Sequence, residues 1–431
     1  MTIDFQKTLS ATWRPRQKRG CMEWVQENCW LSKRFTGREG FYDVSFTPYL
    51  RPLHEWFGDD ETRSIASPKG AQIGYTTFIA NAMAYAIVQE PGPIIYITST
   101  ADNAKSWSER EWLPRIQDCA PLKALCPSDK DDLRKQEQHF LSCTVKLVGA
   151  QSENNLASRP IRYFFGDEVD KWPPGYLGQA EARTISYSSM EKRVKGSTCT
   201  VEDGAIWMDW INSTQHHWHV ACPECKEPQI LDFFKHIKWP GEHRDILGKW
   251  DIEKVRRDTT GVCQHCGAIW QQKAQRAMVA KGEAISTNPH ASKSDKGLHL
   301  PSLLSPFLTW GDLAGIWLQK KEQPGGRQDF YNQYLGLPFT MDEWRITDEK
   351  LLALRREDYQ LRQLTGEPVV LTFAADPGEK MCHWSVEAHC ADGTAYLVDY
   401  GTVHTIEDLL PTFYRLEYTH AVTGKKARPT V

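Results

Sequence analysis

An alternation of short apolar runs with helical stretches between residues 63 and 200 is the sequence feature that most constrains the fold. The apolar runs at 63–67, 93–100, 144–150 and 162–166 are predicted strands. Between the first two runs, apolar residues from Phe78 to Ile87 recur at helical spacing, after a glycine-containing loop. Because strands that alternate with helices usually pair in parallel, this segment predicts an α/β domain with a parallel sheet covered by helices.

The composition fits a cytosolic globular protein of two or three domains. Of 431 residues, 40% are hydrophobic and 25% are charged, which excludes a disordered tail protein and a small stapled scaffold. No apolar run of about 18 residues occurs and the first residues lack the apolar centre of a signal peptide, so neither a membrane span nor secretion is supported. The 52 basic and 55 acidic residues disfavour a wholly basic nucleic-acid coat but leave open a local basic channel.

The rest of the chain is divided by changes in pattern. An amphipathic helix is predicted over 13–31, packed on the next domain or, as the less favoured alternative, serving as a partner-binding arm. Residues 215–300 are polar and interrupt the α/β pattern like an insertion. Further helices are predicted near 310–321 and 330–337, a charged helical linker at 340–367, strands at 369–375, 382–388 and 395–400, and a last helix at 405–415.

A phosphate-binding loop is predicted at residues 69–76. Such a loop needs backbone N–H groups that converge on an anion at a helix N-terminus, a lysine near the phosphates and a hydroxyl for Mg²⁺. Gly74 and Thr76 match the second glycine and the hydroxyl, but Tyr75 stands where the lysine is usual. Lys69, at the other end of the loop, has a side chain long enough to fold back over the phosphates. A simple strand-to-helix turn explains the same residues about as well.

The other half of an ATPase site is predicted at the end of the strand 162–166. Asp167 is expected to bind Mg²⁺ and Glu168 to activate the attacking water. Arg159 could act as an arginine finger, although a salt bridge within the fold is the more common role for such a residue. Tyr49 could stack on adenine, and a place in the core is an equally good explanation.

Two Cys-x-x-Cys pairs form the most specific local motif. Four thiolates at this spacing are typical of a tetrahedral zinc site, and without an open position such a site is structural. The four residues are Cys222, Cys225, Cys263 and Cys266. His216, His217 and His219 precede the first pair and are expected to be surface residues rather than ligands. Free buried thiols are the alternative to zinc.

Together these residues resemble the large terminase subunit of tailed bacteriophages, in the lambda-type branch that carries a four-cysteine insert. The resemblance covers nearly the whole chain. It is carried by residues 69–77, 95–100, 166–173, 196–198, 299–307 and 397–401, and by the cysteine insert.

The resemblance implies an ATP-driven motor that moves duplex DNA into a capsid, with a fused RNase H-like endonuclease. The family's phosphate-loop lysine is displaced, as Lys69 would be here. The implied ATP-binding residues are Lys69, Gly70, Gln72, Gly74, Thr76, Thr77 and Tyr49, with Thr76 and Asp167 on Mg²⁺. Ser197 and Thr198 look like the family's coupling motif, which would sense the γ-phosphate.

The nuclease is expected to be incomplete in this chain. An RNase H-like site needs several carboxylates that bind two Mg²⁺ or Mn²⁺ ions. Asp376 fits the family's first metal-binding acid, and Asp399 is a weaker second one with turn capping as its alternative role. The sequence stops at Val431, before the elements that should deliver the remaining acids.

The predicted architecture is thus a P-loop ATPase of the ASCE/RecA-like class with a zinc insert and a partial nuclease. Its predicted divisions are an N-terminal helical arm (1–60), the ATPase core (61–214), the four-cysteine insert (215–300), a helical subdomain and linker (301–367) and the nuclease domain (368–431). The implied partners are double-stranded DNA, a small terminase subunit, the portal protein and further copies of the chain in a ring, all in the host cytoplasm and without a membrane.

Two other classes of protein remain as alternatives. A helicase-like remodelling ATPase should carry a second RecA-like lobe, for which residues 215–431 offer no pattern. A non-catalytic scaffold stabilised by zinc would tolerate a decayed nucleotide site, and the tyrosine at position 75 would suit it.

Overall fold

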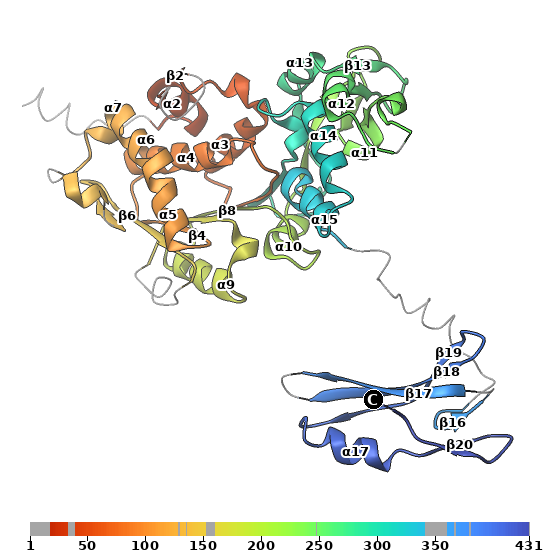
Figure 1. Ribbon diagram of the computed structural model, residues 1–431. Helices are drawn as coiled ribbons and strands as arrows, with labels where there is room; N and C mark the ends of the chain where they lie inside the picture. Colours follow the sequence, from red (N-terminus) through yellow and green to blue (C-terminus); the bar gives the residue numbers. More distant parts are fainter. Residues whose placement is uncertain are drawn as a thin grey trace, which may run out of the picture. The chain divides into compact units, whose positions relative to one another are not determined.

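Two compact units make up the chain, Met1–Thr340 and Met341–Val431 (Figure 1). A computed structural model describes residues 18–32, 39–127, 130–134, 136–151, 160–246, 248–340, 360–365, 368–378 and 381–430. Each unit has its own hydrophobic core.

The first unit is built on a mixed sheet whose middle is parallel. Its strands are β3 (Ser64–Pro68), β4 (Ile94–Thr98), β5 (Glu137–His139), β6 (Thr144–Gly149), β7 (Tyr163–Asp167), β8 (Lys192–Ser197), β9 (His216–Ala221), β10 (Pro228–Ile230), β14 (Glu283–Ser286) and β15 (Asp295–His299). Their order is β10, β9, β15, β3, β8, β7, β4, β6, β5, with β14 also on β9. From β9 to β6 every neighbouring pair is parallel. The predicted parallel α/β sheet is confirmed.

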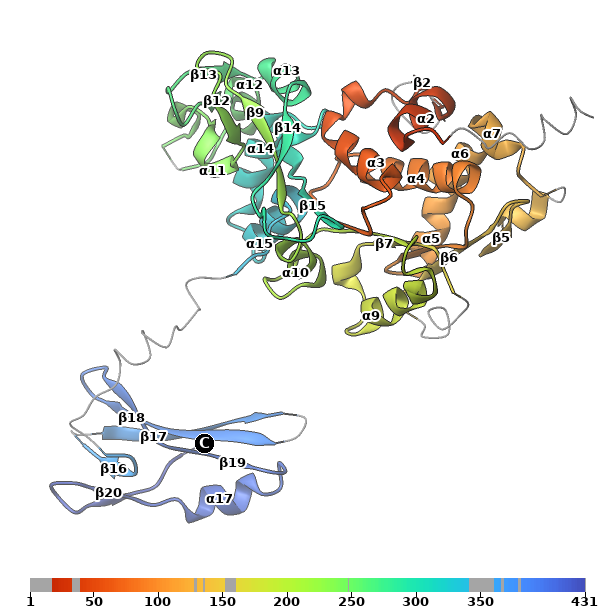
Figure 2. The ribbon, with the colours of Figure 1, turned by 180° about the vertical axis from the view of Figure 1, so that it is seen from behind.

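Helices cover both faces of the sheet because its strands are apolar on both sides. Ile94 and Tyr96 of β4 belong to one buried cluster, whereas Ile95 and Ile97 belong to the other. Residues alternate between the two faces of a strand, so both faces must be covered. One face carries α2 (Cys21–Asn28), α3 (Arg51–Gly58), α4 (Tyr75–Gln89), α5 (Ala101–Trp107), α6 (Leu113–Asp118) and α7 (Ala120–Lys123), and the other carries α9 (Tyr176–Glu181) and α10 (Ala205–Ile211) (Figures 1 and 2).

The N-terminal helix is shorter than the pattern predicts. Residues 13–17 lie outside the described residues, and α2 ends at Asn28 because Cys29 adopts an extended conformation. Trp30 then starts β1 (Trp30–Leu31), which pairs with β2 (Gly40–Phe41). Trp30 and Phe41 pack edge to face at 5.1 Å, so the aromatic contact supports a hairpin where a helix was expected.

The segment 215–300 is continuous with the main sheet at its two ends. Its middle part forms a separate sheet in the order β11 (Ile237–Lys238), β12 (Thr260–Val262), β13 (Ile269–Gln271). Three helices lie in this segment, α11 (Phe233–His236), α12 (Ile252–Asp258) and α13 (Ala274–Ala280), and two more follow it, α14 (Trp310–Lys320) and α15 (Gly326–Phe330). The helix predicted near 310–321 is confirmed. The helix predicted at 330–337 is a π-helical turn over Tyr331–Leu335. Gly336, with a left-handed φ of 62°, ends this turn.

The described part of the second unit contains an antiparallel meander followed by a helix. Strands β17 (Pro368–Pro377), β18 (Cys382–Cys390) and β19 (Ala395–Val403) pair in that order, and α17 (Leu409–Arg415) follows. The unit also contains a small sheet of β16 (Gln363–Leu364), β20 (Tyr418–His420) and β21 (Lys426–Ala427). The helix predicted from residue 405 starts at Leu409 because Thr405 and Asp408 bond to each other in a turn, with the hydroxyl 2.8 Å from the carboxylate.

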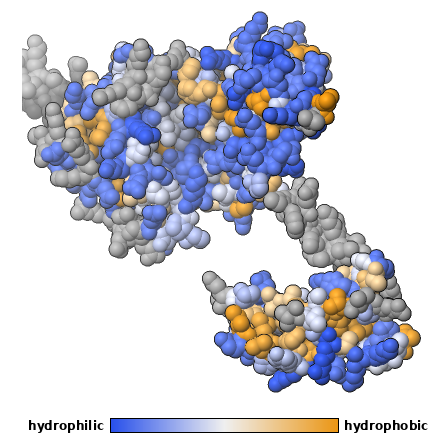
Figure 3. All heavy atoms as spheres, in the orientation of Figure 1, coloured by the Kyte–Doolittle hydropathy of each residue, from blue (hydrophilic) through white to orange (hydrophobic). Residues whose placement is uncertain are grey.

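The surface of the first unit in view is mainly hydrophilic, with apolar residues in small groups (Figure 3). Among the described residues, no helix combines the length and the apolar character needed to cross a bilayer.

Candidate functional site

The carboxyl ends of β3, β8 and β7 meet at one edge of the sheet. Lys69 follows β3, Glu168 follows β7, and Ser197 ends β8, which lies between them. Parallel strands end at the same edge, and this edge is where α/β sheets usually bind ligands. The fold therefore brings residues about 100 positions apart into one site.

Lys69 forms ion pairs with both acids at this edge. Its Nζ lies 2.6 Å from Oε1 of Glu168 and 3.4 Å from Oδ1 of Asp167. Lys69 and Asp167 are buried, and Glu168 is only partly exposed. Buried charges need partners, and here the three groups supply them to one another.

Burial and the ion pairs together shift the pKa values of Lys69, Asp167 and Glu168. Burial raises the pKa of Asp167, and the Lys69 ammonium only partly offsets that effect. Burial opposes the charge on Lys69 as well, but the two carboxylates outweigh it and raise the pKa of Lys69. Burial acts in the same upward direction on Glu168, whereas Lys69 and Lys171 lower the pKa of Glu168 below its ordinary value.

The backbone and side chain of Glu168 are both held by neighbours. Its φ of 55° is left-handed, a conformation that costs a non-glycine residue free energy. The N–H of Glu168 donates to Gly196 O at 2.8 Å. The Thr198 hydroxyl donates to Oε2 at 3.1 Å, and Lys171 Nζ lies 2.8 Å from the same oxygen. Of the two predicted coupling residues, Thr198 thus contacts the predicted water-activating residue, and the Ser197 hydroxyl accepts the N–H of Asp170 at 3.3 Å.

The loop between β3 and α4 presents a helix N-terminus. Gly74 is the N-cap of α4 with a left-handed φ of 77°, and Gln72 has a φ of 57°. The first four N–H groups of a helix have no intrahelical acceptor, and together with the helix dipole they favour an anion. Thr76 and Thr77 lie in this first turn, and the Thr77 hydroxyl is 3.5 Å from Glu111 Oε2.

Tyr75 is a packing residue beneath the loop. Its ring lies so close to β8 that a Cβ on Gly196 would be 2.3 Å from a ring carbon. Lys69 Nζ is 5.5 Å from the centre of the same ring. The position of the usual lysine is thus filled by a buried aromatic residue, and the cation beside the acids comes from Lys69.

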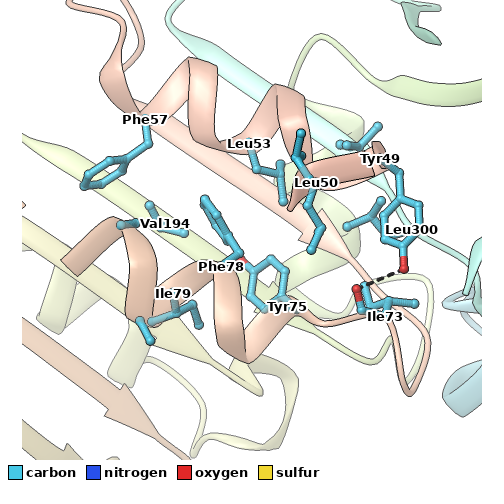
Figure 4. Packing of buried hydrophobic residues seen from close by; sticks show 14 of the residues in the cluster. Tyr49, Leu50, Leu53, Phe57, Ile73, Tyr75, Phe78, Ile79, Val194 and Leu300 are labelled. Atoms are coloured by element: carbon cyan, nitrogen blue, oxygen red, sulfur yellow. Dashed lines mark hydrogen bonds between the residues drawn. The ribbon is translucent and has the colours of Figure 1, made fainter. Parts of the chain in front are cut away.

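Tyr49 does not have a free ring face in this structure. It is fully buried, and its hydroxyl donates to the carbonyl of Ile73 at 3.1 Å (Figure 4). Tyr49 therefore supports the loop from the core side, and the expectation that it stacks on a base finds no support in its position. Arg159 lies outside the described residues.

A cavity of about 630 Å³ adjoins the loop. Gly74 and Thr77 form the part of its wall that belongs to the loop and α4, and Phe46, Phe307 and Arg276 form another part. Phe46 and Phe307 pack edge to face at 5.4 Å. Nothing in the local pattern of the sequence marks these three residues, because they come from segments far apart in the chain.

The four cysteines of the two Cys-x-x-Cys pairs form one cluster. All four Sγ atoms lie within 4.8 Å of one another, and among the described residues this is the one group of three or more such ligands. Cys222 and Cys266 are 3.9 Å apart, and Cys225 and Cys263 are 3.8 Å apart. The predicted cluster is confirmed. The nearby histidines His216, His217 and His219 lie on β9 and are not part of it.

The two predicted nuclease acids lie on opposite faces of the second unit's sheet. Asp376 is exposed near the end of β17 and pairs with His383 across the ladder. Asp399 is 2% exposed, and its carboxylate accepts hydrogen bonds from Tyr418 at 3.0 Å and Arg362 at 3.1 Å. Asp399 thus has a core role here and does not share a site with Asp376.

Comparisons with known proteins agree with this architecture. The model of "Phage terminase large subunit gpA, ATPase domain" matches residues 36–283, and that of "Terminase large subunit gpA, endonuclease domain" matches residues 295–428. Because the second match reaches residue 428, it gives no support to the expectation of a truncated nuclease.

Two relatives are phage large terminase subunits. The chain is 24% identical over 380 residues to that of Escherichia phage lambda, covering 81% of this chain and 57% of the relative. It is 21% identical over 443 residues to that of Enterobacteria phage P21, covering 94% and 65%. The alignments thus span less than two thirds of either relative.

A solved structure, the large terminase of bacteriophage HK97, aligns with 93% of this chain and 71% of its own at a TM-score of 0.44 and 12% identity. The family matches cover both units, and the chain belongs to the gpA family of phage terminase large subunits, with an ATPase domain and an endonuclease domain.

Proposed function

We propose that this chain hydrolyses ATP at the cluster of Lys69, Asp167 and Glu168, and that hydrolysis drives duplex DNA into a phage capsid. The observation that carries the proposal is the contact of Lys69 Nζ with both acids at the edge where β3 and β7 end. A cation, a buried carboxylate and a second acid beside a free helix N-terminus are the groups that phosphoryl transfer requires.

Each residue has a distinct role in this proposal. The N–H groups at the start of α4 bind the phosphates, and Lys69 moves from the acids to the phosphates when the nucleotide binds. Asp167 and the Thr76 hydroxyl would hold Mg²⁺, which prefers oxygen ligands of this kind and would neutralise phosphate charge. Loss of its Lys69 partner leaves Glu168 free to orient and deprotonate the attacking water.

Ser197 and Thr198 serve as the coupling residues. Because Thr198 bonds to Glu168 and Ser197 accepts the N–H of Lys69 through its carbonyl at 2.9 Å, a shift of either charged residue reaches the end of β8. This placement supports the role of the two residues in passing the state of the γ-phosphate to the rest of the unit.

The base of the nucleotide binds in the cavity beside the loop. Phe46 and Phe307 offer aromatic edges and faces, and Arg276 can stack on a purine. We place adenine there instead of against Tyr49, which is buried in the core.

ATP turnover by the purified chain, with and without duplex DNA, tests the proposal. Both Lys69→Ala and Glu168→Ala should lower turnover by at least roughly 100-fold, and Glu168→Ala should retain nucleotide binding. The matched controls are the exposed residues Lys123 and Glu109, whose change to alanine should leave turnover intact. Normal hydrolysis by either site variant would remove the proposed site.

The four-cysteine cluster is proposed to hold a structural zinc ion. Four thiolates around zinc at about 2.3 Å form a tetrahedron with edges of about 3.8 Å, close to the two shortest Sγ separations. Left-handed residues follow each pair, Lys226 and Gly267, as a tight turn around a metal requires. Metal analysis should find one zinc per chain, lost in Cys263→Ser together with thermal stability. A metal-free chain of unchanged stability would contradict the assignment.

The second unit is proposed to be a metal-dependent nuclease of the RNase H-like class that cuts the packaged DNA. Support comes from its antiparallel three-strand sheet followed by a helix and from the exposed position of Asp376. Asp376 would contribute to a site for Mg²⁺ or Mn²⁺. The domain divisions at 60, 214, 300 and 367 also remain proposals.

The proposed partners follow from the motor role. Duplex DNA is gripped through its phosphates, so binding should weaken steeply with salt. A small terminase subunit, the portal protein and a ring of further copies complete the assembly in the host cytoplasm. Arg159, from its own or a neighbouring subunit, remains the proposed arginine finger.

A further inference from the structure

We infer that residues 299–305 form a bracket that sets the conformation of the phosphate loop, with Ser302 and Ser305 as positioning residues for nucleotide binding. The inference rests on the proposed ATP site. This segment is part of the sequence pattern shared with terminases, and no role in the site follows from the sequence. It continues from β15, which pairs with β3 on the side opposite to β8.

Three hydrogen bonds join the bracket to the loop. The N–H of Gly70 donates to Leu300 O at 2.8 Å, and the Ser302 hydroxyl donates to Ala71 O at 2.7 Å. The Ser305 hydroxyl donates to Gln72 O. Ser302 is 0% and Ser305 1% exposed, so neither hydroxyl is available to solvent.

These bonds fix the direction of the loop's N–H groups. In a planar trans peptide the C=O and the following N–H point in opposite directions. Because the carbonyls of Ala71 and Gln72 face the bracket, the N–H groups of Gln72 and Ile73 face away from it. Both N–H groups are thereby kept free for an anion before any nucleotide arrives, and binding need not supply the free energy of ordering them.

The loop conformation is one that needs external support. Gln72 has a left-handed φ of 57°, a backbone conformation that is unfavourable for an L-residue with a side chain. Gly70 lies so close to the bracket that a Cβ there would be 2.5 Å from Ser302 Oγ. A glycine at position 70 is therefore required by contact with the bracket, whether or not a phosphate is bound.

The bracket is itself anchored by a buried side chain of α13. Gln275 Nε2 donates to Leu303 O at 3.2 Å and to Ser305 O at 3.3 Å, and its Oε1 accepts the N–H of Trp310 at 3.2 Å. His299 Nε2 contacts Leu335 O at 2.9 Å. These contacts do not involve the loop, so the bracket is a fixed frame against which the loop is set.

Removing a hydroxyl of the bracket should weaken the binding of ligands that carry phosphates and leave the binding of adenosine unchanged. Ser302→Ala and Ser305→Ala leave Lys69, Asp167 and Glu168 unchanged. Each should raise the Kd for ATP and ADP roughly tenfold, because a buried loop carbonyl loses its donor and the N–H groups lose their fixed direction. KM for ATP should rise by a similar factor while kcat changes less than twofold. Adenosine, which has no phosphate, should bind as it does to the unmodified chain.

Calorimetric titration of the full chain with ATP, ADP and adenosine tests the inference. The control is Ser286→Ala, because the Ser286 hydroxyl also donates to a backbone carbonyl, that of Thr214, away from the loop. Ser305→Cys keeps the size of the side chain and a weak donor, so it should give an intermediate affinity and remain informative if the alanine variant does not fold.

Equal losses of ATP and adenosine affinity, or no loss in any bracket variant, would overturn the bracket while leaving the ATP site standing. Absence of ATP binding by the unmodified chain would overturn both the bracket and the proposed function.

Discussion

The two units place their acidic residues by different sheet geometries. In the first unit, β3, β8 and β7 run parallel, so the residues that follow them gather at one edge, and Lys69, Thr198 and Glu168 come into contact. In the second unit, β17 and β19 are both antiparallel to the middle strand β18, so they run in the same direction, but Asp376 lies level with Thr402 whereas Asp399 lies level with Phe373. The functional residues thus converge at one edge in the first unit, whereas the two acids of the second unit lie at different levels of its sheet.

The two acids of the second unit also lie on different faces of its sheet. Asp399 lies in the same row as Val386 and Phe373, which belong to the buried side of the second unit's sheet. Asp376 is three residues after Phe373, and an odd separation along a strand changes the face. In an antiparallel sheet, a residue's position in the alternation therefore decides whether an acid meets solvent or the core.

The largest effects are expected for substitutions of Asp376 and Asp399, which should change two different properties of the second unit. Asp376→Ala should abolish metal-dependent cleavage of DNA and leave the melting of the second unit unchanged, because the residue is exposed. Asp399→Ala should destabilise that unit by about 1–3 kcal/mol, since the buried Tyr418 hydroxyl loses its acceptor. Nuclease assays and calorimetric melting of the same samples separate the two results. Unchanged melting of Asp399→Ala would mean that Asp399 is not a core residue.

Acid should destabilise the first unit more than the second. Burial lowers the pKa of His54 and of His299 to about 4, whereas the described histidines of the second unit are all at least partly exposed. The folded pKa lies below the unfolded value of about 6.5, so the unfolded chain takes up protons first, and stability falls as pH drops from 6.5 to 4.

The expected loss is roughly 2 kcal/mol per buried histidine at pH 5 relative to neutral pH. Calorimetric melting between pH 7 and pH 5 measures it. His54→Gln should remove part of the dependence, and the same change at the exposed His139 should not. Equal acid sensitivity of the two units would contradict the role of burial.

The smallest effect is expected at Lys171. Once Lys69 turns to the phosphates, Lys171 is the remaining cation on Glu168, and its side chain is 45% exposed. Such a pair contributes under about 1 kcal/mol, so Lys171→Ala should raise the pKa of Glu168 and move the acid limb of the kcat profile upward by less than about one pH unit. Lys171→Arg should keep the original profile. A downward shift would show that Lys171 does not stabilise the charged form.

Patterns local in sequence predicted much of the fold. The structure contains all four strands predicted at 63–67, 93–100, 144–150 and 162–166, and the helix predicted from Phe78 to Ile87. These elements could be predicted because the spacing of apolar residues along the sequence follows the spacing of buried positions in a strand or helix. Helix ends were less predictable. Trp30 lies in a hairpin opposite Phe41 and not in the predicted helix. The spacing of apolar residues within the helix cannot predict a contact with a residue outside it.

By itself, the sequence determined the α/β class and the four-cysteine cluster. It also predicted that the loop at 69–76 and the two acids after the strand 162–166 belong to one site. These features depend on spacing along the chain. The tertiary structure alone decided that β8 lies between β3 and β7, that Ser302 and Ser305 bond to a loop more than 200 residues earlier, and that Asp399 is buried. The physical reason is that strand order, register and parity arise from contacts between distant segments, which no local pattern contains.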